Sequence, residues 1–194
     1  MSENGKNIIN VIKEIRQLSE QIHLLLSTSD ELMKEKGWEP FNKTVMVEHS
    51  NSLDIPEEWY PYYLFRFYKK DKSNFLLYIG ILLYNDNEGY YEITEQPLIT
   101  AGYFDYGQNK VTLNTFEWWY AKWFGYLEEK ADGIIYSSDD NWKDNWKASS
   151  NEDSKINYPF INWKCFGLPL TNITNSDELQ SKIIKKLIDI LPNK

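Results

Sequence analysis

The first part of the chain carries the clearest pattern of apolar positions. Between residues 6 and 36, apolar side chains recur with alternating steps of four and three residues, which places them on one face of a helix. This apolar stripe comprises Val11, Ile15, Leu18, Ile22, Leu25 and Leu32, with the polar Ser29 at the same spacing, and it is widened by Ile8, Ile12, Leu26 and Met33. The pattern predicts one continuous helix over residues 6–36 that ends at Gly37, with a weak point at the polar residues 27–30.

Such a stripe has to be buried, either on the chain's own sheet or against the same helix of a second copy. Its heptad-like spacing is typical of a coiled coil. The stripe is wider than a strict coiled-coil seam, however, and this favours packing on a sheet. Its use as an extension that forms a homodimer is the alternative.

Strand patterns follow Gly37. Runs of β-branched and aromatic residues are separated by polar turns at 69–74 and 85–89, as in an antiparallel meander. The predicted strands cover residues 41–47, 59–68, 75–84, 90–94, 98–106, 134–136 and 160–170. Residues 75–84 are apolar almost throughout, which is expected of a strand covered on both faces.

Two further helices are predicted in the second half of the chain. One begins at the capping residue Asn114 and extends to Asp132, and the other begins at Asn175 or Ser176 and stops before Pro192. We therefore expect an α+β fold in a single domain over residues 1–194. It has a long N-terminal helix, an antiparallel sheet of about five or six strands, and helices packed mainly on one face.

Charge and cysteine content narrow the classes of partner. The net charge of −8 and the pI of about 4.9 make nucleic acid an unlikely partner and favour a basic protein surface. The single cysteine excludes an internal disulfide and any cysteine-based metal cluster. The first residues lack a secretory signal, and the longest apolar run is half of the roughly 20 residues that a membrane helix needs. We expect a cytoplasmic protein that does not contact membranes.

No catalytic residue, metal site or cofactor is predicted. The sequence shows no glycine-rich phosphate-binding loop, no nucleophilic serine between glycines at a strand-to-helix turn, and no cluster of metal ligands. The strongest enzymatic alternative is a metal-dependent nuclease, in which acidic residues at strand ends would bind Mg²⁺. The acids considered are Asp71, Asp86, Glu92 and Asp105, with acid-x-Lys triplets at 128–130 and 153–155.

The stretch 102–107 is the most site-like segment, because two glycines enclose aromatic residues and one carboxylate. It suggests a pocket for a planar, nucleotide-like ligand. The residues of this predicted pocket are Tyr103, Asp105, Tyr106, Trp118, Trp119 and Arg66. The alternative is a hairpin end that is stiffened by aromatic packing.

Trp142 and Trp146 stand four residues apart in the polar segment 137–155, and they either anchor a loop or present a partner surface. Aromatic residues make up 16% of the chain, and Tyr and Trp suit binding surfaces. The predicted function is a non-enzymatic, soluble interaction protein that acts through an acidic, aromatic-rich surface, such as an inhibitor or an immunity or defence-type protein.

Overall fold

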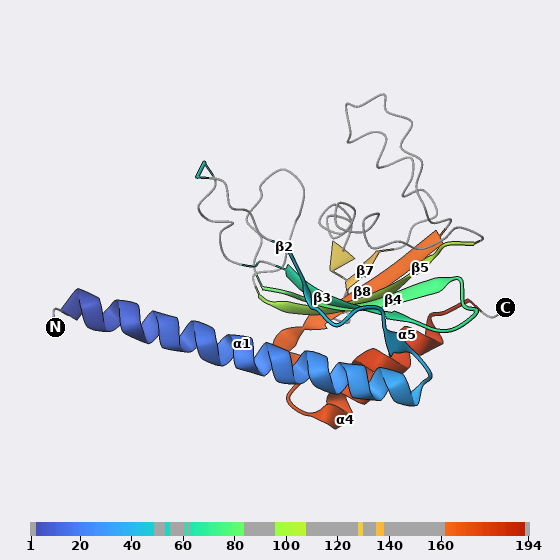
Figure 1. The fold of residues 1–194 in the computed structure, drawn as a ribbon, viewed down its shortest axis with the longest axis horizontal. Coiled ribbons are helices and arrows are strands. Elements are labelled where there is room, and N and C mark those ends of the chain that lie inside the picture. The colour runs from blue at the N-terminus through green and yellow to red at the C-terminus, as the bar shows by residue number, and fades with distance from the viewer. Residues whose placement is uncertain are drawn as a thin grey trace.

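The computed structural model describes residues 3–48, 53–54, 61, 63–83, 96–107, 128–129, 135–137 and 162–192. Figure 1 shows the long helix α1 (Glu3–Glu35) and a C-terminal helical segment on the same side of an antiparallel sheet. The C-terminal segment consists of α4 (Ser176–Glu178), the π-helical turn η5 (Leu179–Ile184) and α5 (Lys185–Asp189), after the short 3-10 turn η4 (Leu170–Asn172). The α+β class and the continuous N-terminal helix are confirmed.

The sheet is built around four long strands. These are β3 (Tyr63–Lys69), β4 (Phe75–Leu82), β5 (Leu98–Asp105) and β8 (Asn162–Pro169), all paired antiparallel. Four short strands complete it: β1 (Glu39–Pro40), β2 (Met46–Glu48), β6 (Glu128–Glu129) and β7 (Ile135–Ser137). The order is β1-β3-β4-β5-β8-β7-β6, and β2 also pairs with β3. The predicted antiparallel sheet is confirmed, and short segments extend both of its edges to eight described strands.

Two sequence predictions need correction. Residues 41–44 form bends and residue 45 has no regular structure, whereas β1 and β2 on either side of them pair with β3. Glu128 and Glu129, predicted to lie in a helix, form the strand β6 opposite β7. The predicted strand 90–94 and residues 114–127 of the predicted helix lie outside the described residues.

The second half of α1 packs on the sheet and ends as predicted. Gly37 has a φ of +76°, its N–H donates to the Lys34 carbonyl (2.8 Å), and the Trp38 N–H donates to the Met33 carbonyl (3.0 Å). This is a Schellman motif, and the buried Met33 and Trp38 supply its hydrophobic contact. The weak point within the helix is tolerated because the buried Ser29 hydroxyl donates to the Leu25 carbonyl at 2.9 Å.

The helix-covered face of the sheet is mainly aliphatic. Its buried residues belong to one core with the inner face of α1 and of the C-terminal segment. The sheet contributes Leu77, Ile79, Ile81, Ile99, Ala101 and Leu168 together with the aromatic Tyr68, Phe75, Tyr103 and Phe166. The helix α1 contributes Ile22, Leu26 and Met33, and the C-terminal segment contributes Leu179, Ile183, Ile184 and Leu187. Burial of this apolar area is the main source of stability.

The opposite face of the same strands is aromatic. Its buried rings are those of Tyr63, Phe65, Phe67, Tyr78, Phe104 and Trp163. Neighbouring rings lie at centroid distances between 4.6 and 6.3 Å, as favourable aromatic pairs do. The strands β4 and β5 are thus buried on both faces, as their apolar sequence indicates.

Glycines make room for these rings. A Cβ atom at Gly80 would lie 2.4 Å from the Tyr63 hydroxyl oxygen, which forms a hydrogen bond with the Thr100 hydroxyl at 3.0 Å. A Cβ atom at Gly102 would lie 2.4 Å from the Lys164 carbonyl oxygen and 2.7 Å from the Tyr78 ring. Gly102 therefore serves close packing between β5, β8 and a tyrosine ring.

The C-terminal segment begins with a complete cap. The Asn175 side chain accepts a hydrogen bond from the Glu178 N–H (3.0 Å), and the Glu178 carboxylate accepts from the Thr174 N–H and hydroxyl, both at 2.8 Å. The Lys182 ammonium also donates to this carboxylate at 2.7 Å. These hydrogen bonds, led by that from Lys182, lower the pKa of Glu178 to about 2.

We predict that Gly102→Ala destabilises the protein by about 2–3 kcal/mol, because the added methyl overpacks a contact with backbone and an immobile ring. The free energy of unfolding from urea denaturation measures this effect. A loss below about 0.5 kcal/mol, which is typical of a neutral surface substitution, would show that β5 and β8 separate easily here.

A second prediction concerns acid stability. The Glu178 pKa is depressed from its usual 4.5 to about 2, so the stabilisation by its ionised form is complete above pH 4.5 and is lost as the pH falls towards 2. The difference in unfolding free energy between the wild type and Glu178→Gln should therefore shrink across this range. A difference that stays constant from pH 5 to pH 2.5 would contradict the assignment.

Candidate functional site

The predicted pocket around residues 102–107 is described only in part, and its described residues on β5 and just after it are buried. Tyr103, Asp105 and Tyr106 are all buried, and the Tyr103 ring packs edge-to-face on Phe75 at 5.5 Å. The Asp105 carboxylate accepts a hydrogen bond from the Gly107 N–H at 2.9 Å and closes a turn. Burial, followed by the negative charge of Asp105, raises the pKa of Tyr103. These contacts match the hairpin-end alternative.

The four tryptophans proposed for binding are Trp118, Trp119, Trp142 and Trp146, and all lie outside the described residues. Their roles therefore stay predictions. Of the acids considered for a nuclease, Asp71 lies in the exposed β3–β4 turn and Asp105 is buried. Asp86 and Glu92 lie outside the described residues.

Arg66 has a different position from the one that the predicted pocket requires. Its guanidinium donates from Nε and Nη2 to both carboxylate oxygens of Asp30 in α1, at 3.2 and 2.5 Å. Nη1 donates to the backbone carbonyls of Asn42 (3.1 Å) and Thr44 (2.6 Å). Arg66 thus joins α1, β3 and the bends between β1 and β2, and β4 separates it from Tyr103 on β5.

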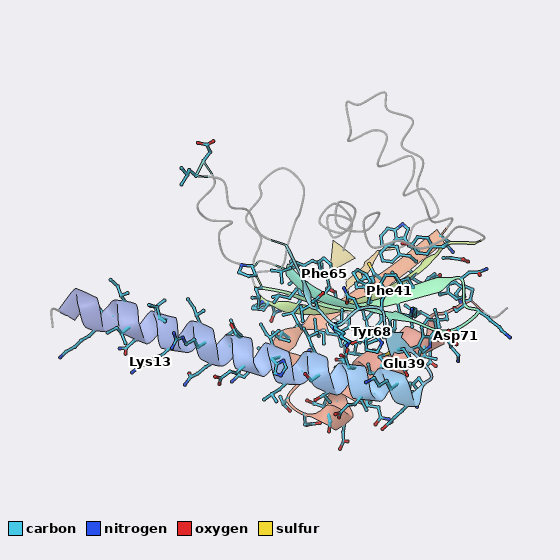
Figure 2. The ribbon with its side chains drawn as sticks, in the orientation of Figure 1. Lys13, Glu39, Phe41, Phe65, Tyr68 and Asp71 are labelled. Atoms are coloured by element: carbon cyan, nitrogen blue, oxygen red, sulfur yellow. The ribbon has the colours of Figure 1, made fainter. Side chains whose placement is uncertain are left out.

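Tyr68 lies beside this ion pair, on the side of the sheet that faces α1 (Figure 2). Burial, followed by the negative charge of Asp30, raises its pKa well above 10, and the nearby Arg66 opposes this rise. Within the described part of the chain its hydroxyl makes no hydrogen bond of ordinary geometry. The Asp30–Arg66 ion pair is thus largely buried, and it stabilises the attachment of α1 to the sheet.

The exposed apolar surface lies at the other end of α1. Figure 1 shows that the N-terminal half of the helix extends beyond the sheet and the C-terminal segment. Here Ile8, Val11, Ile12 and Leu18 are 62, 53, 45 and 36% exposed, and Ile15 is half-buried. Ile22, four residues further on, is 6% exposed. We call Ile8, Val11, Ile12, Ile15 and Leu18 the N-terminal seam.

The N-terminal seam continues the stripe by which α1 packs on the sheet. Both halves belong to one uninterrupted helix of 33 residues, which is about 50 Å long at 1.5 Å per residue. The attached half fixes the axis, so the free half extends a helix that already exists and needs no separate nucleation. Apart from the exposed Ile9, polar and charged side chains, including Lys13 in Figure 2, occupy the rest of its surface.

A shallow groove is a second surface feature. It has a volume of about 350 Å³ and lies between the end of α1 and the C-terminal segment. It is lined by Lys36, Asp177, Gln180, Ser181, Lys185, Ile188 and Asp189. Its two lysines and two aspartates balance in charge, so the groove does not select for a charged ligand.

The described ranges hold no group of three or more His, Cys, Asp or Glu residues placed to bind a metal ion. In the same ranges, no helix has the length and apolar content that spanning a bilayer requires. Comparison of the chain with protein-family models, curated proteins and solved structures finds no match.

We predict that Asp30→Ala destabilises the protein by about 3 kcal/mol, because it leaves the buried Arg66 guanidinium without its counter-charge. Arg66→Met should cost less, because the partly exposed Asp30 can be hydrated. Chemical denaturation of both variants measures the difference. Equal costs, or a larger cost for Arg66→Met, would show that the contacts of Arg66 with Asn42 and Thr44 matter more than the ion pair.

Proposed function

We propose that the protein is a non-enzymatic interaction protein and that the N-terminal seam is its contact surface. The observation that carries the proposal is the exposure of a continuous apolar stripe on a helix that stands clear of the body. Single apolar residues are common on protein surfaces, and Leu24, 64% exposed on another face of α1, is one example. Contiguous apolar stripes are rare on monomers and mark interaction sites.

The form of the surface suggests how it binds. An amphipathic helix is recognised through anchors spaced three and four residues apart, either in a groove or by another helix. Ile8, Val11, Ile15 and Leu18 have this spacing. Because the helix is already formed, binding does not require the ordering of a flexible segment.

This proposal shifts the contact surface away from the aromatic residues. Most of the described rings are buried in the core, as the aromatic face of the sheet shows. A surface formed by Trp142 and Trp146 remains a second prediction for a protein partner, which the net charge of −8 suggests is basic. Inhibition of another protein, as in immunity or defence, is one activity that such a surface can serve.

We also place the protein in the cytoplasm. The free thiol of Cys165 is buried in β8, which suits a reducing compartment in which the chain needs no disulfide. This assignment supports a partner from the same compartment.

To test the proposed surface, Ile8→Ser and Ile12→Ser are combined in one variant, with Leu24→Ser on another face of the same helix as the matched control. The immobilised full chain is used to retain proteins from a lysate of the native host, and bound proteins are quantified. We expect the double variant to lose retained proteins and the control to keep them. Both should unfold within about 0.5 kcal/mol of the wild type, because the sites are exposed. Equal retention by both variants would contradict the proposal.

A further inference from the structure

We infer that the N-terminal seam pairs with the same seam of a second copy of the chain, with the two helices antiparallel. This inference rests on the proposed function and names its partner. Three features favour this pairing: the heptad positions of the seam, the point where the sheet begins to cover the stripe, and the distribution of charge.

The seam is self-complementary in the antiparallel direction. Ile8 and Ile15 occupy heptad position a, and Val11 and Leu18 occupy position d. A two-fold axis level with Lys13 sets Ile8 opposite Leu18 of the second copy and Val11 opposite Ile15 of the second copy. All four positions of both chains are then filled by apolar partners, as the isologous interface of a symmetric dimer requires. The two Ile12 side chains lie beside the axis and widen the contact.

The fold of each subunit disfavours the parallel alternative. From Ile22 onward the same stripe faces the subunit's own sheet, and Ile22, Leu26, Ser29 and Met33 are buried there. A parallel partner helix would have to continue into the space that the sheet occupies. An antiparallel partner runs the other way, and its seam ends beside Leu18, before the sheet covers the stripe.

Charge favours the same orientation. Residues 3–21 contain three acidic and three basic side chains and are neutral overall, whereas the whole chain carries −8. An antiparallel pair separates the two Ile22 positions, where the bodies begin, by about 27 Å along the axis at 1.5 Å per residue. This exceeds the screening length of about 8 Å at physiological salt. A parallel pair would set the two acidic bodies side by side.

One residue distinguishes the two orientations. Glu14 occupies heptad position g, and in the antiparallel pair the two Glu14 side chains face each other near the two-fold axis. In a parallel pair Glu14 faces Ser19 of the second copy instead. Glu14→Gln should therefore tighten an antiparallel dimer about two-fold, because a repulsion between like charges is removed, and should leave a parallel one unchanged.

The orientation is tested by single-cysteine cross-linking of the full chain with a short bismaleimide. Glu14→Cys places two thiols close together only in the antiparallel pair. Leu18→Cys places two thiols in contact in a parallel pair, but about 15 Å apart along the axis in the antiparallel one. The wild type is the background control, because its one thiol, Cys165, is buried. We expect covalent dimers from Glu14→Cys and almost none from Leu18→Cys or the wild type.

Sedimentation across a concentration series measures the association itself. The wild type and Leu24→Ser should dimerise reversibly, while Val11→Ser combined with Ile15→Ser should remain a folded monomer. Cross-linking of Leu18→Cys alone would overturn the antiparallel orientation. A wild type that stays monomeric at all concentrations would overturn self-pairing. The proposed function would still stand in that case if the seam variant lost its retained proteins and Leu24→Ser kept them.

Discussion

The attachment of α1 to the sheet is the constraint on which the rest of the structure depends. Only the second half of the apolar stripe, from Ile22 to Met33, meets the aliphatic face. The Asp30–Arg66 pair fixes the helix there and also holds the bends at residues 42–44, so one guanidinium sets both the helix and the β3 edge. The same attachment leaves the first half of the helix extending beyond the sheet and the C-terminal segment, as far as the chain is described.

The two faces of the sheet are stabilised by different kinds of side chain. The helix-covered face is mainly aliphatic, and its side chains tolerate changes of shape where they pack against α1 and the C-terminal segment. The opposite face relies on aromatic rings that fit over Gly80 and Gly102, where little adjustment is available. The high aromatic content of the chain therefore serves the core within the described residues, and the exposed surface that draws attention is aliphatic instead.

Sequence patterns predicted α1, its end at Gly37, the long strands and the capped C-terminal segment, because each depends on local spacing or a local cap. The failures involve contacts distant in sequence. Residues 41–45 are β-branched in part, yet Arg66 takes two of their carbonyls into its own hydrogen bonds. The spacing of apolar residues showed which face of α1 is apolar but not how far the sheet covers that face. The exposed N-terminal seam and its boundary at Ile22 could therefore be located only from the structure.

The π-helical turn η5 has a consequence for changes in chain length. A regular α-helix turns about 100° per residue, so the loss of one residue rotates everything beyond it away from its contacts. The wide turn from Leu179 to Ile184 holds one residue more than an α-turn does. A single deletion inside it would restore ordinary helical winding and leave Leu187 facing the sheet. This turn is thus a point where the chain can shorten without disturbing the core beyond it.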